Sequence, residues 1–162
     1  MSIKPCMKPA GFGKIISKRI HIFSDASTTG HGAVAYLRLC NDSNKINCAF
    51  LMGKSRLAPI KMLTIPRLEL TSATVSVRLG RKLLQELSME SNAITYYTDS
   101  TTILHYIKSE KRRFPVFVSN RVQLIRDYSN ISQWKYVDTH ENHDYPVSKW
   151  LETNVGLTDP SC

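Results

Sequence analysis

The chain has 162 residues, of which 42% are hydrophobic and 22% charged, a composition typical of one globular domain and unlike that of a disordered segment. It contains no apolar run of the roughly 18 residues that a membrane span needs, so we expect no contact with membranes. The 22 Lys and Arg residues against 13 Asp and Glu residues leave a net charge of +9, which favours a polyanionic partner, nucleic acid first.

The first half of the chain predicts three strands. Residues 1–19 are basic and show no clear period, so we interpret them as a lead-in or a fragment edge. Strands are then predicted over 20–23, over 32–40, where apolar and polar residues alternate, and over 46–53 after a turn. We expect these three strands to form an antiparallel meander.

From Pro66 to Leu87, the hydrophobic residues recur with the period of a helix. Pro66 suits a first helical turn, and Thr64 is placed to cap it. Further along, the sequence predicts a strand over 93–99, a helix over 100–109 with Ser100 as its cap, a helix over 116–129, a strand over 133–138 and a short helix after Asp144.

This order of elements, β-β-β-α-β-α-α-β-α, predicts an α/β fold. Because a strand that leads through a helix to another strand usually pairs with it in parallel, the sheet is expected to be mixed. We predict five strands, three antiparallel and then parallel ones, with helices on both faces, in one domain over 20–150 and an atypical tail over 151–162.

The four cysteines form no CxxC pair and have no His at zinc-like spacing. We expect reduced thiols in an intracellular protein, cytoplasmic or nuclear. Cys40 and Cys48 flank a turn and could face each other across a hairpin, an alternative that the sequence leaves open.

Three acidic residues stand where an active site would collect them. Asp25 ends the first predicted strand, Asp99 ends the fourth, and Glu69 lies early in the long helix. Active sites of open α/β sheets gather at such strand ends. If the first and fourth strands are neighbours, Asp25 and Asp99 lie side by side, and Glu69 can point at them.

Clustered carboxylates repel one another unless a cation joins them. Magnesium prefers oxygen ligands, and two such ions roughly 4 Å apart can hold a scissile phosphate and activate the attacking water. The alternative is structural: taken singly, each Asp suits an Asp-Ser turn and the Glu suits a solvated helix face. The functional interpretation therefore depends on the joint placement of the three residues.

Five segments match a known family in order: "FSDASTTGHGAVAYLR", "KSRLAPIKMLTIPRLEL", "TDSTTILHYI", "FVSNRV" and "WKYVDTHEN". In these segments, over about residues 20–149, the chain resembles the ribonuclease H domain of Pao/BEL-type retrotransposon polyproteins. "TIPRLEL" after "KSRLAP" is the most specific part, whereas "TDS" alone would be weak.

The resemblance implies a ribonuclease H-like fold and cleavage of the RNA strand of RNA/DNA hybrids. It places the metal-binding carboxylates on Asp25, Glu69 and Asp99, with two Mg²⁺ or Mn²⁺ ions as cofactors. It also implies reverse transcriptase and integrase parts of the same polyprotein as partners, and we expect a monomer. The alternative function is a catalytically impaired, nucleic-acid-binding relic of such a polyprotein.

Two other chemistries fit the carboxylates less well. Integrases and transposases of this fold place their Glu last, whereas Glu69 comes second here. An aspartyl-phosphate phosphatase would need a second Asp two residues after Asp25, and that position is Ser27.

The last family motif resembles "ENPADLxSR", and its carboxylate position falls on Tyr145. Asp144 lies one residue early, which is about 100° of rotation on a helix. Asp144 is therefore either a helix N-cap ahead of Pro146 or a shifted fourth metal ligand. In ribonucleases H generally, a His in the loop before the last carboxylate can assist proton transfer or product release, which makes His140 a candidate for this role, although the Pao/BEL pattern often has another residue there.

Substrate contacts are expected from residues around the site and from a basic run. These are Lys54, Arg56, Arg112, Arg113, Asn120, Arg121, Ser27, Ser100 and Thr101. Lys and Arg side chains neutralise phosphates without reading sequence, and the hybrid would be recognised by groove shape and RNA 2′-hydroxyls. Alternatively, the basic run is a solvated connection between helices, Phe117 packs in the core, and Lys54 and Arg56 fix their loop.

Overall fold

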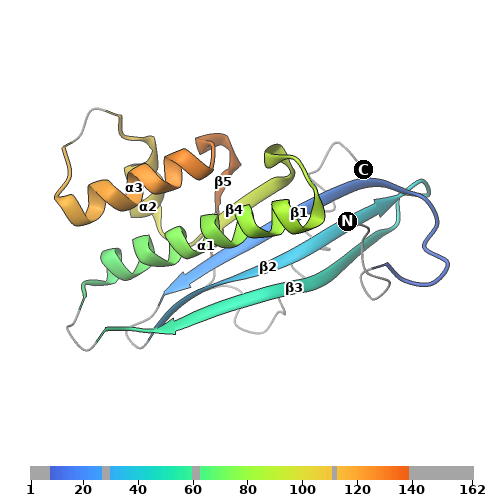
Figure 1. Ribbon diagram of the computed structural model, residues 1–162, viewed down its shortest axis with the longest axis horizontal. Helices are drawn as coiled ribbons and strands as arrows, with labels where there is room; N and C mark the ends of the chain where they lie inside the picture. The colour runs from blue at the N-terminus through green and yellow to red at the C-terminus, as the bar shows by residue number, and fades with distance from the viewer. Residues whose placement is uncertain (1–7, 27–29, 60–62, 111–112, 139–162) are drawn as a thin grey trace.

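The described residues form a five-stranded mixed sheet with three α-helices (Figure 1). The computed structural model describes residues 8–26, 30–59, 63–110 and 113–138, without the side chain of Asp25. The strands are β1 (Ile15–Ala26), β2 (Gly30–Asn41), β3 (Ile46–Leu57), β4 (Ile94–Thr98) and β5 (Trp134–Tyr136). The helices are α1 (Ile65–Leu87), α2 (Thr101–Lys108) and α3 (Val116–Tyr128), with short 3-10 turns η2 (Ser91–Ala93) and η3 (Ile131–Gln133).

The strand order is β3-β2-β1-β4-β5. The pairs β1–β2 and β2–β3 are antiparallel, and the pairs β1–β4 and β4–β5 are parallel. This confirms the predicted meander and the predicted parallel half. It also makes β1 and β4 neighbours, which was the condition for bringing the two aspartates together.

The first strand is longer than its sequence pattern indicates. It begins at Ile15, so residues 15–19 belong to the sheet and not to a lead-in. Because Ser17, Lys18 and Arg19 are polar, the hydrophobicity pattern does not indicate this part of the strand. The strand forms there because strand pairing uses backbone groups, and β2 extends far enough to pair with it up to Asn41.

Helix α1 begins one residue before the predicted start and ends at the predicted Leu87. Thr64 occupies the N-cap position but forms no side-chain capping hydrogen bond, so this detail of the prediction was wrong. The backbone carbonyl of Thr64 accepts hydrogen bonds from Arg67 and Leu68 instead. No helix in the described ranges is long and apolar enough to cross a membrane.

The main core lies between the sheet and the three helices. Its buried members include Ile20 and Ile22 of β1, Val77 of α1, Ile103 of α2 and Ile125 of α3. A smaller cluster centred on Tyr97 and Val137 packs Phe23 and Tyr36 against it. The described helices thus share one core, and the short helix expected after Asp144 falls outside the described residues.

Cys40 is buried and Cys48 is half-buried. The β2–β3 register pairs Cys40 with Ile46 and Cys48 with Arg38, so the two cysteines do not face each other across the hairpin. The alternative of a cross-hairpin pair was therefore wrong. The turn that contains Asn44, whose φ is +59°, sets a different register between β2 and β3.

Candidate active site at the ends of the first and fourth strands

Asp25 and Asp99 come to the same end of two neighbouring parallel strands. The β1–β4 register pairs Phe23 with Tyr97, and each aspartate follows two residues later in its own chain segment. The Ser24 hydroxyl also joins β1 to β4, because it donates a hydrogen bond to the Tyr97 carbonyl at 3.1 Å. Strand order and register therefore place these two backbone positions next to each other.

Glu69 reaches this strand end from helix α1. The Ser100 hydroxyl, one residue after Asp99, donates a hydrogen bond to Glu69 Oε2 at 2.6 Å. The same hydroxyl accepts a hydrogen bond from the backbone N–H of Ile103 at 3.2 Å, as expected of an N-cap. Hydrogen bonds to a carboxylate are short and strong, so Ser100 holds the Glu69 carboxylate beside the end of β4.

Helix α1 also lies close to the position of Asp25. Ser72, one turn after Glu69, donates a hydrogen bond to the Gly32 carbonyl at 2.5 Å, and Gly32 is the β2 partner of Asp25. A Cβ atom on Gly32 would lie 2.6 Å from the Lys54 carbonyl, so only glycine fits there. Helix α1, β1 and β4 thus converge on one end of the sheet.

The predicted metal-binding set includes residues whose side chains the structure does not describe. Among the side chains that the structure describes, no three His, Cys, Asp or Glu residues gather closely enough to hold a metal ion. The Asp25 side chain lies outside that description, as do Asp144, His140, Ser27 and Arg112. Glu69 and Asp99 are both half-buried, and both offer the carboxylate oxygens that Mg²⁺ and Mn²⁺ prefer.

The predicted substrate-contacting residues fall into two groups. Ser100 is buried and Thr101 exposed at the start of α2, and Lys54 and Arg56 are exposed near the end of β3. Because Ser55, which lies between Lys54 and Arg56, pairs with Gly32, these two cations lie at the same end of the sheet as the carboxylates.

The second group lies on and before helix α3. Asn120 and Arg113 are exposed, and Arg121 is half-buried. Phe117 is half-buried and packs against the main core, as the alternative interpretation proposed. The Arg121 guanidinium lies 3.5 Å from the Phe117 ring centroid and Arg67 lies 5.0 Å from it, so the ring also supports two cations.

Sequence reasoning missed His31 and Arg67. His31 lies on β2 opposite Ala26, is 9% exposed, and its Nδ1 has no hydrogen-bond partner in the described structure. Burial, and next the nearby Arg56 charge, lower the pKa of His31. The signal was available in "TGHGA", where a His stands between small residues one residue from the pairing partner of Asp25.

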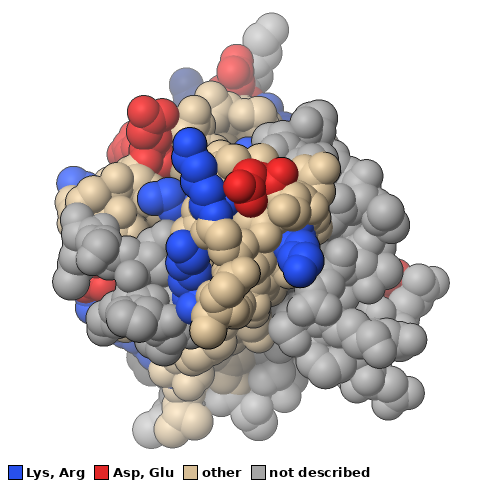
Figure 2. Space-filling view, turned by 90° about the vertical axis from the view of Figure 1, so that its right-hand side faces the viewer, with Lys and Arg blue, Asp and Glu red and all other residues tan. Residues whose placement is uncertain are grey.

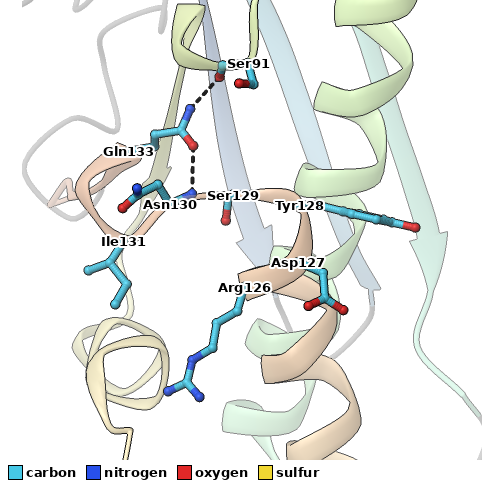
Figure 3. Close-up of a pocket in the computed structure, with 8 residues that line it drawn as sticks. All are labelled: Ser91, Arg126, Asp127, Tyr128, Ser129, Asn130, Ile131 and Gln133. Carbon is cyan, nitrogen blue, oxygen red and sulfur yellow. Dashed lines mark hydrogen bonds between the residues drawn. The ribbon is translucent and has the colours of Figure 1, made fainter.

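A surface cavity of about 420 Å³ lies at the other end of the molecule, where α3 ends and β4 begins (Figure 3). Its polar groups serve the fold. Gln133 donates hydrogen bonds to the carbonyls of Ser91 and Ile94, and Arg126 donates to three carbonyls at the end of α2. Figure 2 views this end of the molecule and shows basic and acidic side chains interspersed. We therefore place the candidate site at the carboxylate end.

Several solved structures are similar to this one. RNase H1 from the halophilic archaeon Halobacterium salinarum NRC-1 has 10% sequence identity and a TM-score of 0.48, over 80% of this chain and 93% of that chain. The N-terminal RNase H domain of a Mycobacterium tuberculosis protein has 9% identity and a TM-score of 0.43, over 76% and 84%. LC11-RNase H1 from compost, solved with an RNA/DNA hybrid, has 12% identity and a TM-score of 0.42, over 78% and 89%.

No curated protein matches the sequence of this chain. The family model described as "Pao retrotransposon-like RNaseH-like domain" matches residues 10–100, which is more than half of the chain. This match confirms the resemblance that the motifs indicated, and the chain belongs to the family of Pao retrotransposon-like RNaseH-like domains.

Proposed function

We propose that this chain is a metal-dependent endonuclease that cleaves the RNA strand of RNA/DNA hybrids. The observation that carries the proposal is the convergence of Asp25, Glu69 and Asp99 on one end of the sheet, with Glu69 held there by Ser100. The membership of the RNaseH-like family and the net charge of +9 support a nucleic acid as the substrate.

The carboxylates of Asp25, Glu69 and Asp99 would hold two Mg²⁺ or Mn²⁺ ions, with Asp144 as a further candidate ligand. Their donor atoms fit this role, because all are hard carboxylate oxygens. Bound ions of this kind lower the pKa of water and neutralise the charge that develops on the scissile phosphate. The chain's own residues would orient the site: Ser100 binds Glu69, and the β1–β4 pairing brings the backbone positions of the two aspartates to one end of the sheet.

Substrate positioning belongs to the same proposal. Lys54, Arg56 and Thr101 are exposed at the carboxylate end, where they would contact phosphates or sugars next to the cleaved bond. The expected partners, the reverse transcriptase and integrase parts of a polyprotein, follow from the family and are proposed with it.

The test is cleavage of an end-labelled RNA/DNA hybrid by the full chain, with Mg²⁺ and then with Mn²⁺. Asp25→Asn, Glu69→Gln and Asp99→Asn should each lower the cleavage rate about a hundredfold or more, because each removes a ligand that the transition state needs. Asp127→Asn is the matched control, because Asp127 is an exposed carboxylate on α3 that bonds only Gln123 among the described side chains.

The outcomes separate the two candidate functions. Cleavage that survives in Asp25→Asn would show that the assigned carboxylates do not form the site. A folded wild-type chain that binds the hybrid without cutting it, with either metal, would establish the alternative function of an impaired nucleic-acid-binding relic.

A further inference from the structure

Helix α1 carries three arginines on one stripe of its surface. Arg78 and Arg81 follow Arg67 by 11 and 14 residues, which at 100° per residue places all three within about 60° of one another. All three are exposed. Helix α3 runs beside α1 in the same direction (Figure 1) and adds Arg121. We call Arg67, Arg78, Arg81 and Arg121 the basic seam.

Aromatic rings of α3 hold three of the four guanidinium groups. Phe117 supports Arg121 at 3.5 Å and Arg67 at 5.0 Å, measured from Cζ to the ring centroid. Tyr128 supports Arg81 at 4.6 Å. Side chains held in this way lose less conformational freedom when they bind a ligand, so the seam is partly preorganised.

No carboxylate in the described ranges neutralises the charges of the seam. Within the described part of the chain, no ion pair joins a seam arginine to a carboxylate. Burial, and then the charges of Arg78 and Arg67, lower the pKa of Arg121. The positive charges thus raise one another's free energy, and an anion bound between them would remove that repulsion.

Packing alone explains part of the seam but not all of it. Arg67, Arg81 and Arg121 each stack on a ring and so help to join α1 to α3. Arg78 stacks on no ring among the described residues, and its charge adds to the repulsion at Arg121. The charge of Arg78 therefore has no role in joining α1 to α3 through a ring, and it is exposed to a ligand of opposite charge.

We propose that the basic seam binds successive phosphates along one strand of the nucleic acid whose cleavage is proposed above, on which this inference rests. Arg67 and Glu69 both lie in the first two turns of α1, so the seam begins at the carboxylate end of that helix, about 160° around the helix axis from Glu69. It extends about 16 Å along α1 to Arg78, a length over which one strand of a duplex presents several phosphates. The planar guanidinium fork matches phosphate oxygens in pairs, and such contacts are independent of base sequence.

The test measures binding of a fluorescently labelled RNA/DNA hybrid by the full chain in EDTA, so that no cleavage occurs, over a series of salt concentrations. Each phosphate contact contributes about 0.9 to the slope of log K against log salt, so Arg78→Gln should weaken binding about eightfold at about 0.1 M salt and reduce the slope by about 0.9. The loss should be equal for hybrids of different base sequence.

Two further variants keep the result interpretable. Lys18→Gln is the matched control, because Lys18 carries the same charge, is exposed and lies on β1, seven residues before Asp25 and on no helix. Arg78→Lys should keep the salt slope because the charge remains. If Arg121→Gln fails to fold through the loss of its ring contact, Arg78→Gln still decides, because Arg78 is exposed and packs on no described ring.

The seam and the proposed activity can fail separately. An Arg78→Gln chain that binds like Lys18→Gln overturns the seam, whatever the cleavage assay shows. If the wild-type chain binds the hybrid more tightly than Arg78→Gln does but does not cut it, the seam is supported and the proposed activity is overturned. A folded wild-type chain that does not bind the hybrid overturns both.

Discussion

Ser100 forms two hydrogen bonds that serve different purposes. As an acceptor it binds the Ile103 N–H and caps α2, and as a donor it binds the Glu69 carboxylate at 2.6 Å. The cap could be predicted because a Ser directly before an apolar helical pattern is a local signal. The bond to Glu69 could not, because it joins residues 31 positions apart that meet only when α1 packs beside β4.

Ser100→Ala should therefore affect stability and activity together. Loss of the cap is expected to lower the free energy of unfolding by about 1 kcal/mol, measured by urea denaturation. Cleavage should also fall, because Glu69 loses the hydroxyl that orients it. Ser100→Thr keeps a hydroxyl and is the control. An unchanged free energy of unfolding in Ser100→Ala would show that the cap contributes nothing.

At the scale of elements, α1 approaches the sheet most closely at Gly80. A Cβ atom there would collide with the Tyr96 hydroxyl and lie 3.1 Å from Ile94 Cδ1. Glycine inside a helix is about 1 kcal/mol less favourable than alanine, so the packing explains a residue that helix propensity disfavours. Tyr96 itself is buried, and that burial raises the pKa of its hydroxyl.

Gly80→Ala is expected to destabilise the protein by about 1–3 kcal/mol, because overpacking outweighs the gain in helix propensity. Adding Tyr96→Phe removes the colliding hydroxyl, so the double variant should lose less than the sum of the two single losses, as a double-mutant cycle in urea would measure. Gln85→Ala, at an exposed position of α1, should be nearly neutral. Strict additivity of Gly80→Ala and Tyr96→Phe would contradict the assigned contact.

At the scale of the whole molecule, the candidate site joins distant parts of the chain. Asp25, Glu69 and Asp99 come from β1, α1 and the end of β4, and only the folded chain brings these positions together. A metal ion that binds there would bind the native state and not the unfolded one. Binding should therefore stabilise the entire domain by mass action.

Thermal unfolding with Mg²⁺ tests this linkage without any substrate. At about ten times its Kd, the ion adds about 1.4 kcal/mol, which for a chain of this size raises Tm by about 3–6 °C. EDTA should reverse the rise, and Asp99→Asn should abolish it. An equal rise in wild type and in Asp99→Asn would show that the ion binds elsewhere.

The sequence by itself determined which elements form and in what order, because their signals are local. The helix over Pro66 to Leu87 followed from apolar spacing, the α2 cap from Ser100, and the candidate carboxylates from their places at element ends and from the family motifs. The early part of β1 escaped prediction because Ser17 to Arg19 are polar, and polar residues join a strand when a partner strand supplies the hydrogen bonds.

Only the tertiary structure decided which distant residues meet. The β1–β4 register placed Asp25 beside Asp99, the packing of α1 brought Glu69 to Ser100, and the parallel run of α1 and α3 set Arg67 against Phe117. None of these pairs has a local signal, because each depends on the geometry of sheet pairing and helix packing across dozens of residues. The chemistry of the site is therefore present in the residue types, but its geometry is a property of the fold.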